Sequence, residues 1–368
     1  MHKVIIRKSD YKYPSLTQSI FEMMDSLAGD KIQRGSRVVI KPNLLAPASP
    51  DKAIVTHPLI VKAVAEYVLD RGAIPQISDS SAVGSFERVL KDSGIKEALS
   101  GLAVEYKEFK ESSIVDVGEP FKKIEIAADA LNADVLINLP KLKTHMQMVL
   151  TLGVKNLFGC IVGMKKPEWH FRTGVNREMF AQLLVKIYQA VNPAINIMDG
   201  ILAMEGQGPG KRGEPRHLGV LLGSSNAAAL DITVCRMLGI VPETVLTNKF
   251  AVEQGIVTDD ISVDGELPRI TDFKLPEITP LLFGPQKFHG LLRRHLVQRP
   301  ECDDSLCKLC GECWKYCPAE AITHSGKKVR FDYDKCIRCY CCIEVCPHGV
   351  LSARETLAGK VTRKMLKL

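Results

Sequence analysis

The sequence predicts an α/β domain with a mostly parallel sheet, followed by a small α+β domain that is rich in cysteine. Over residues 1–280, short runs of Val, Ile and Leu alternate with segments in which apolar residues recur every three or four positions. This alternation is typical of strands and helices that follow one another in an α/β fold. All of the twelve cysteines except Cys160 and Cys235 lie within residues 301–352. We therefore expect domains at 1–280 and 301–352, a linker at 281–300 and a basic tail at 353–368.

The first half of the chain shows the alternation clearly. Strands are expected at residues 4–7, 37–43, 74–78 and 135–140, where the side chains are mostly apolar. Helices are expected at 15–27, 58–71 and 85–93. Gly29, Gly72 and Gly94 follow these helices and act as stop signals.

The second half continues the pattern. Residues 148–161 are read as an apolar helical segment, and Asn176 is expected to cap a helix at 177–191. A strand at 195–198 is expected to end at Asp199-Gly200, and a Gly-rich loop covers 205–213. A strand at 218–222 and helices up to Leu238 and over 242–254 follow, while residues 262–265 are read as a turn.

The cysteines form a duplicated motif. The run Cys307-x-x-Cys310-x-x-Cys313-x-x-x-Cys317-Pro318 recurs 29 residues later, from Cys336 to Pro347. Three closely spaced cysteines and a fourth before proline are typical of cubane iron–sulfur ligation, in which the fourth cysteine ligates the other cluster. The spacing predicts two [4Fe-4S] clusters. Their ligands would be Cys307, Cys310, Cys313 and Cys346 for one cluster, and Cys336, Cys339, Cys342 and Cys317 for the other.

Zinc is the alternative for paired C-x-x-C motifs, but a structural zinc site needs only four ligands. Eight ligands in two identical runs favour clusters, and disulfides are disfavoured because nothing points to export. Cys302 and Cys341 fall outside the ligand pattern and are expected to be spare thiols. Cys160 and Cys235 are expected to be core residues.

Residues 301–352 resemble the bacterial-type two-cluster ferredoxin module. The resemblance rests on the two cysteine runs and on the proline that follows each of them. It implies a small α+β ferredoxin domain that passes single electrons, usually at low potential.

Composition limits the function classes. The formal charge is +7, and two oxidised clusters with their thiolates would reduce it to about +3. This small excess does not favour nucleic-acid binding. No run of 18 apolar residues exists and no signal peptide is apparent. We therefore expect no integral membrane segment and a cytoplasmic location.

Polar side chains gather where the apolar strands end. Open α/β sheets bind ligands outside the carboxyl ends of their strands, and lysines there favour a small anionic substrate or cofactor. Any single polar strand end is commonplace, but several together predict a site. The expected anion-binding residues are Lys41, Asn43, His57, Lys141, Lys155, Asn156 and Asp199.

Lys143 and His145 are the candidate catalytic residues. His145 suits general acid–base chemistry, although a structural histidine fits equally well. His57 opens a helix, where it would bind an anion or cap the helix. A divalent metal held by these histidines with Asp79, Asp199 or Asp231 stays a minor alternative, because no tight metal-binding spacing is present.

The Gly-rich loop at 205–213 is not a phosphate-binding P-loop. Arg212 stands where that motif requires Ser or Thr, and the glycine spacing differs. A turn whose amides bind an anion and a flexible connection remain as alternatives. No nicotinamide fingerprint follows a strand, and whether this domain binds flavin is left open.

Five segments of the N-terminal domain resemble the family named domain of unknown function 362, a group of uncharacterised iron–sulfur proteins. The resemblance implies an α/β fold and an association with clusters, without implying a reaction. The segments are Ile40-Lys-Pro-Asn43, Thr56-His-Pro58, Leu139-Pro-Lys-Leu-Lys-Thr-His145, Leu152-Gly-Val-Lys-Asn-Leu-Phe-Gly159, and Asp199-Gly200 with Glu205-Gly-Gln-Gly-Pro209.

Three functional hypotheses follow. In the first, the chain is an iron–sulfur oxidoreductase that relays low-potential electrons to an anionic ligand of its own N-terminal domain. In the second, it is a ferredoxin-type electron-transfer partner of another redox protein, with no catalysis of its own. In a third and weaker one, the clusters of a non-redox enzyme are structural or sensory. The sequence does not identify the substrate, the electron donor and acceptor, the cluster potentials or the oligomeric state.

Overall fold

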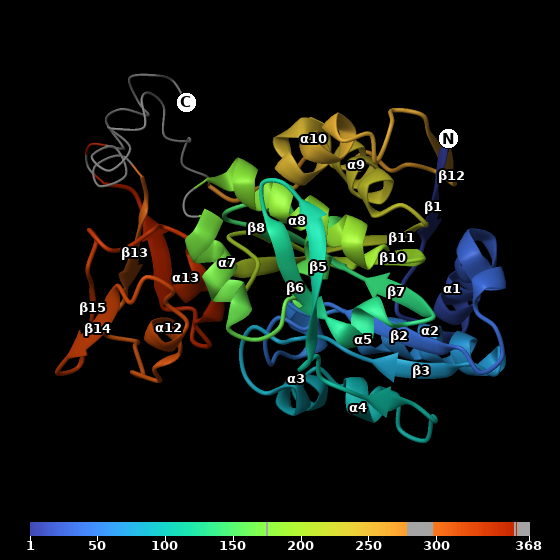
Figure 1. The fold of residues 1–368 in the computed structure, drawn as a ribbon, viewed down its shortest axis with the longest axis horizontal. Coiled ribbons are helices and arrows are strands. Elements are labelled where there is room, and N and C mark those ends of the chain that lie inside the picture. Colours follow the sequence, from blue (N-terminus) through green and yellow to red (C-terminus); the bar gives the residue numbers. More distant parts are fainter. Residues whose placement is uncertain (174–175, 278–296, 357, 359–368) are drawn as a thin grey trace.

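The computed structural model describes residues 1–173, 176–277, 297–356 and 358. The α/β domain forms the larger part of the molecule, and the cysteine-rich domain lies at one end of it (Figure 1). Residues 281–296 of the expected linker, and residues 357 and 359–368 of the expected basic tail, lie outside the described residues.

A largely parallel sheet runs through the α/β domain, as the sequence predicts. Seven strands of this ten-stranded sheet point the same way as β1, and β11 runs antiparallel between β1 and β10. The strand order is β12 (Ile261–Asp264), β1 (His2–Lys8), β11 (Gly213–Ser224), β10 (Ile195–Gly206), β7 (Val135–Leu139), β2 (Arg37–Pro42), β3 (Ile74–Ile77) and β4 (Glu105–Tyr106).

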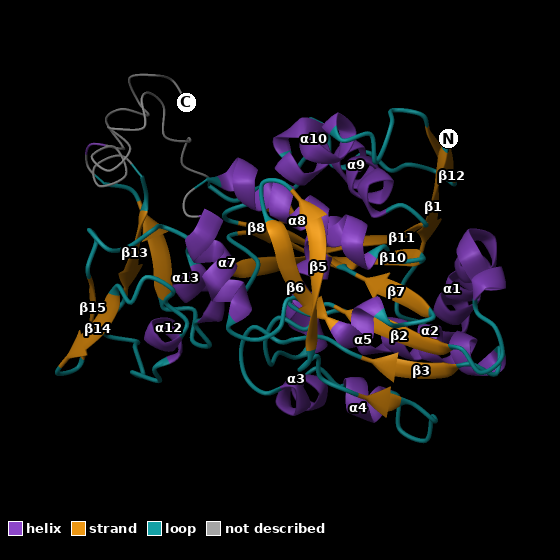
Figure 2. Cartoon of the chain, in the orientation of Figure 1, coloured by secondary structure: helices purple, strands orange, loops and turns teal. Residues whose placement is uncertain are grey.

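Helices cover both faces of the sheet (Figure 2). Neighbouring strand residues therefore enter different cores: Val38 and Ile197 face one core, and Val39 and Met198 face the other. This explains why these strands read as continuous apolar runs. The first core contains α1 (Tyr13–Ala28), α2 (Pro58–Asp70), α3 (Phe86–Asp92) and α4 (Ile95–Ala98), and the second contains α5 (Ala128–Leu131), α8 (Arg177–Val191), α9 (Ala227–Met237) and α10 (Leu246–Glu253).

Short elements after β7 build the rim of the sheet. β8 (Lys141–His145) leaves the end of β7 after Pro140, pairs with β10, and pairs on its other side with β9 (Val149–Thr151). The chain then forms α6 (Gly153–Asn156), the 3₁₀ helix η3 (Leu157–Cys160) and α7 (Lys165–Thr173). Three further 3₁₀ turns lie elsewhere: η1 (Gly29–Lys31), η2 (Pro50–Lys52) and η4 (Pro242–Thr244).

Several local predictions were wrong. Residues 148–161 form a strand and two short helices instead of one helix, so Cys160 ends a 3₁₀ helix. Asp199 lies inside β10, which continues to Gly206, and residues 262–264 belong to β12 instead of a turn. The hairpin β5 (Ser112–Gly118) and β6 (Lys122–Ala127), in which Ile124 and Ile126 of β6 are buried, was not anticipated. In contrast, Asn176 caps α8 by accepting the Met179 amide at 2.9 Å, as predicted.

The cysteine-rich domain is a small α+β unit. Strands β13 (Arg299–Cys302) and β16 (Leu351–Arg354) pair antiparallel, so the two ends of the domain meet. A second antiparallel pair, β14 (Ile322–Ser325) and β15 (Lys328–Phe331), lies between the helices α12 (Glu312–Lys315) and α13 (Cys341–Val345). Cys313 of the first run lies in α12, and Cys342 of the second run lies in α13.

A ladder of buried asparagines ties the sheet to α6. Asn138 of β7 donates to Asn196 Oδ1 at 2.9 Å and to the Gly153 carbonyl at 3.0 Å. It accepts from Asn156 at 2.8 Å, and Asn156 in turn accepts from Asn43 at 2.8 Å. Because buried amides need partners, these bonds fix the positions of α6 and the end of β2.

We expect Asn138→Ala to lower the free energy of unfolding by about 2–4 kcal/mol, because it leaves several buried polar groups without partners. Urea unfolding under anaerobic conditions measures this change. The control is Asn132→Ala, which alters an exposed side chain nearby and should change stability by less than about 0.5 kcal/mol. Equal effects of the two substitutions would contradict the role of the ladder.

Candidate functional site between the two domains

The structure gathers the eight predicted ligand cysteines into two groups, each around its own small cavity. Cys307, Cys310, Cys313 and Cys346 line one cavity. Cys317, Cys336, Cys339 and Cys342 line the other. The fourth cysteine of each run therefore joins the other run, which is the crossed arrangement that the spacing predicts.

Each cysteine group suits a cubane with four thiolates. Apolar side chains and prolines complete most of both cavities, and Cys302, Lys308 and His348 also line the first one. Backbone amides point at two of the sulfurs. The Leu309 amide donates to Cys307 Sγ at 3.4 Å and the Ala321 amide donates to Cys317 Sγ at 3.3 Å. Such amides stabilise thiolates and tune cluster potentials. In the described part of the chain, no three His, Cys, Asp or Glu side chains are placed to hold a single metal ion.

A much larger cavity lies between the α/β domain and the cysteine-rich domain. Its volume is about 340 Å³, within the usual range for small-molecule sites. The cysteine-rich domain contributes Lys315, Tyr316, Cys341, Glu344 and Val345 to its wall. The polar residues contributed by the α/β domain are Asn43, Asp79, Ser80, Ser81, Lys143, His145, Thr151, Lys155, Asn156, Lys166 and His170.

The β8–β9 hairpin presents Lys143, His145 and Thr151 to this cavity. Lys143 pairs with Thr151 across the hairpin, and His145 lies two residues further along the same strand face. The Lys143 ammonium donates to Asn43 Oδ1 at 2.7 Å and to the Ile54 carbonyl at 2.8 Å. Burial, followed by the charge of Lys155, holds the pKa of Lys143 well below its usual value.

His145 is locked in one tautomer. Its Nδ1 accepts the Gln147 amide at 3.1 Å and the Met148 amide at 3.3 Å, so the neutral ring carries its proton on Nε2. That atom lies 3.1 Å from Glu344 Oε1 of α13, although their geometry is not that of a hydrogen bond. Burial, followed by the charge of Lys155, lowers the pKa of His145 to about 4.

Glu344 of the cysteine-rich domain is surrounded by titratable side chains of the α/β domain. Burial alone would raise the pKa of this carboxyl, but the influence of His145, then of Lys155 and His170, outweighs burial and holds it at about 2. Lys155 makes no ion pair within 4.0 Å among the described residues. Burial lowers its pKa, which the charge of Glu344 opposes. Lys155 is therefore a cation without a close counterion on the cavity wall.

Several buried polar atoms on this wall have no hydrogen-bond partner among the residues that the structure describes. They are Ser81 Oγ, His145 Nε2, Thr151 Oγ1, His170 Nδ1 and Glu344 Oε1. Most buried polar atoms in proteins are satisfied, and such exceptions call for an explanation. Their concentration around one cavity is the arrangement expected of a polar ligand's binding site.

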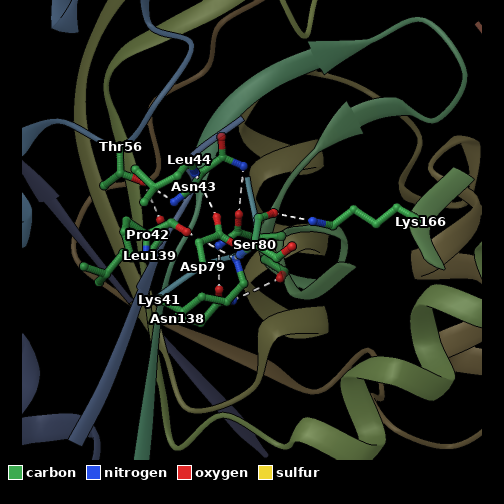
Figure 3. Close-up of polar contacts among 12 residues, drawn as sticks. Lys41, Pro42, Asn43, Leu44, Thr56, Asp79, Ser80, Asn138, Leu139 and Lys166 are labelled. Carbon is green, nitrogen blue, oxygen red and sulfur yellow. Dashed lines mark hydrogen bonds and ion pairs between the residues drawn. The ribbon is translucent and has the colours of Figure 1, made fainter. Parts of the chain in front are cut away.

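Asp79 on the cavity wall forms a buried ion pair with Lys41 behind it (Figure 3). Lys41 lies 3.0 Å from Asp79 Oδ1, and Asp79 Oδ2 accepts the Leu44 amide at 3.0 Å. Gly159 packs against this pair so closely that a Cβ there would lie 2.2 Å from Asp79 Oδ1. Lys166 reaches the Ser80 carbonyl from α7, and burial lowers the pKa of Lys166 to about 8.

Lys141, Asp199 and His57 form a separate, closed cluster. Lys141 donates to Asp199 Oδ2 at 2.7 Å, and the same oxygen accepts the His57 amide at 2.9 Å. Tyr11 donates to Asp199 Oδ1 at 2.8 Å and stacks on the His57 ring with centroids 3.6 Å apart. His57 also caps α2, because its Nδ1 accepts the Leu59 amide at 3.3 Å.

Only some of the residues predicted to bind an anion therefore line the cavity. Asn43, Lys155 and Asn156 line the inter-domain cavity together with the catalytic candidates Lys143 and His145. Lys41 is engaged by Asp79, while Lys141, His57 and Asp199 satisfy one another. Strand-end reasoning missed Lys166, His170 and Glu344. A sequence signal existed only for Glu344, which lies between two motif cysteines.

The fold and the cysteine groups define a two-domain iron–sulfur protein, in which an α/β domain shares a cavity with a ferredoxin-like electron-transfer module. Residues 38–236 match the family described as a domain of unknown function, DUF362, and the chain belongs to this family. Residues 306–350 match the 4Fe-4S dicluster domain. The family resemblance and the fold class drawn from the sequence are confirmed.

One relative covers most of this chain, and two iron–sulfur relatives cover only a short part of it. The thylakoid-associated protein sll1697 of Synechocystis sp. is 36% identical over 289 residues, covering 76% of this chain and 89% of the relative. The PorD subunit of pyruvate synthase from Thermotoga maritima is 39% identical over 59 residues, covering 16% of this chain and 60% of the relative. A probable iron–sulfur subunit of the frd operon in Proteus vulgaris is 35% identical over 65 residues, 17% of this chain and 40% of the relative.

No helix among the described residues combines enough length with enough apolar character to cross a membrane.

The buried His57 makes stability depend on pH. Burial lowers its pKa to about 4, below the unfolded value of about 6.5. Its contribution to stability is complete above about pH 6.5 and is lost as the pH falls toward about 4, because only the unfolded chain takes up the proton. We expect His57→Asn, which keeps an acceptor for the Leu59 amide, to flatten this dependence by up to about 1.4 kcal/mol per pH unit. Urea unfolding between pH 5 and 7 measures the slope, and an unchanged slope would refute the assignment.

Proposed function

We propose that this protein relays low-potential electrons through two [4Fe-4S] clusters to a small anionic substrate or cofactor bound in the inter-domain cavity. The proposal is carried by one observation: Cys341 and Glu344 of α13 share the cavity wall with Lys143 and Lys155 of the α/β domain. Because Cys341 directly precedes the predicted ligand Cys342, a molecule in this cavity lies against the cluster-binding segment. Short separation is what electron transfer between a cluster and a ligand needs.

The eight motif cysteines would hold the clusters, in the two groups that surround the small cavities. When bound, each cluster supplies one electron at a time, and the potentials of such clusters extend to about −700 mV. The crossed arrangement of the fourth cysteines places both groups in one compact domain. This supports transfer from one cluster to the other and then to the cavity.

Lys155 and His145 would bind the anion. Among the described residues, Lys155 supplies a charge that has no counterion within 4.0 Å, and His145 presents a fixed Nε2–H beside Glu344. The Thr151 hydroxyl on the same wall has no partner within the described part of the chain. A partly buried cation and neutral donors bind an anion more strongly than the same groups in water, because the surroundings screen them less.

Lys143 is suited to move a proton. Two of the three protons of its ammonium are used by Asn43 Oδ1 and the Ile54 carbonyl, and the third position is left for the cavity. Neutral Lys143 would keep both bonds, so loss of a proton changes only the side that faces the ligand. Its lowered pKa makes the ammonium a better acid. When the ligand accepts an electron, Lys143 would supply the proton that neutralises the added charge.

We expect Lys155→Met to weaken binding of a small anion at least ten-fold while leaving the iron and sulfide content unchanged. Isothermal titration calorimetry with inorganic phosphate and with benzoate, on the anaerobically reconstituted protein, measures the affinity. The matched control is Lys165→Met, which removes a half-exposed lysine of α7 that pairs with Glu125 outside the cavity.

Two outcomes would overturn the proposal. Equal affinities in the two variants and the wild type would show that the cavity is not the anion site. Iron and sulfide contents well below about eight of each per chain would refute the two-cluster assignment. Survival of electron transfer to an external acceptor in the Lys155→Met variant, with anion binding lost, would instead favour a ferredoxin-type partner without catalysis of its own.

A further inference from the structure

The two cysteine groups differ in their exposure to solvent. In the group of Cys307, Cys313 and Cys346, the fourth member, Cys310, is exposed. Leu306, which directly precedes Cys307, is 59% exposed. Cys313 and Cys346 of this group are buried, as are Cys339 and Cys342 of the other group, whose remaining members are partly buried. The group of Cys310 is thus the one with a member open to solvent.

Basic residues from both domains surround the exposed group. Lys308 lines its small cavity and is exposed. Lys211 and Arg212 come from the Gly-rich loop between β10 and β11, and both are exposed. A Cβ added at Gly349 would lie 3.3 Å from the Cβ of Lys211. Arg212 donates to the Leu351 carbonyl at 3.2 Å.

These contacts place the Gly-rich loop against the exposed group, since Leu351 and His348 also line its cavity. One carboxylate of the same edge, Asp303, accepts from the amide and the hydroxyl of Ser305. Asp304 follows it and acts on Cys302, which lines the same cavity. The three cations Lys211, Arg212 and Lys308 therefore face this edge against two carboxylates, of which Asp303 is already hydrogen-bonded. We call the surface formed by Lys211, Arg212, Leu306, Lys308 and Cys310 the entry face.

We propose that the entry face is the docking surface for an acidic, ferredoxin-type electron donor, and that electrons enter through the cysteine group that contains the exposed Cys310 before they pass toward the cavity. The inference rests on the two-cluster assignment of the proposed function. It assigns to the Gly-rich loop a role in partner binding, in place of phosphate binding or a plain connection.

Charge and exposure together specify this partner. A basic surface steers an acidic protein to the correct orientation and raises its association rate. An exposed apolar side chain such as Leu306 among charged residues of the same surface suits a weak, transient redox interface. In each encounter the donor is oxidised by one electron and the exposed group's cluster is reduced by one, so no proton or further reactant is required.

The test measures complex formation on the reconstituted full-length protein. The probe is a small acidic [2Fe-2S] ferredoxin in its oxidised form, with affinity determined by calorimetry at low and high salt. We expect the double variant Lys211→Glu with Lys308→Glu to lose at least ten-fold in affinity at low salt, and the wild-type affinity to fall as salt increases. Stopped-flow reduction by the reduced ferredoxin should slow in parallel.

The matched control is Lys31→Glu with Arg34→Glu. It makes the same change in charge at exposed positions next to α1, at the opposite end of the molecule from the cysteine-rich domain (Figure 1). Its affinity should stay within two-fold of that of the wild type. Reduction by methyl viologen, a small cationic mediator, should not slow in either variant, which shows that the clusters are intact.

An unchanged affinity in the entry-face variant, or an equal loss in the control, would overturn the proposal. These outcomes are separate from failure of the proposed function. Failure of the two-cluster assignment appears as a deficit of iron in the wild type, and failure of the anion site leaves ferredoxin binding unaffected.

Discussion

The candidate site depends on how four lysines are compensated at the rim of the sheet. Moving a cation out of water costs several kcal/mol unless partners replace the lost hydration. Lys41 and Lys141 are each neutralised by a buried aspartate. Lys143 has two neutral acceptors. Lys155 has no close counterion among the described residues, and its charge remains available to a ligand.

The same constraint connects the two domains. Glu344 is the carboxylate from the cysteine-rich domain whose charge acts on both Lys155 and His145, and it lies on α13 between the ligand candidates Cys342 and Cys346. Charge at the anion site is therefore felt close to both cysteine groups. The β10–β11 loop adds a second connection, because Gly208 bonds to the β8–β9 hairpin while Arg212 bonds to the cysteine-rich domain.

The sequence predicted the features that depend on local pattern. The cysteine spacing predicted which four motif cysteines would lie together at each small cavity, because a ligand loop has a characteristic spacing. It did not predict that Cys302 also lines the first cavity. Apolar runs located β2, β3 and β7, since strands covered on both faces need continuous apolar sequence. The grouping of Lys143, His145 and Lys155 followed from the rule that ligands bind at the carboxyl ends of parallel strands.

Other features depend on tertiary contacts that no local pattern encodes. Asp199 looked like a strand end because Gly200 follows it, but pairing with β11 continues β10 beyond that glycine. Lys141 and Lys143 are two residues apart and have the same chemistry. Only the packing of Tyr11 and Asp199 on one side, and of Asn43 on the other, gives them different environments. The contribution of α13 to the cavity required knowledge of how the domains pack.

We expect an anion bound at Lys155 to lie beside the cluster-binding segment. Electron–nuclear double resonance of the reduced, reconstituted protein tests it most directly, with ³¹P-phosphate and carboxyl-¹³C benzoate as probes. We expect a dipolar coupling between the cluster spin and the labelled nucleus in the wild type, and its loss in Lys155→Met. A saturated anion site without coupling, or a coupling that survives the substitution, would contradict the account.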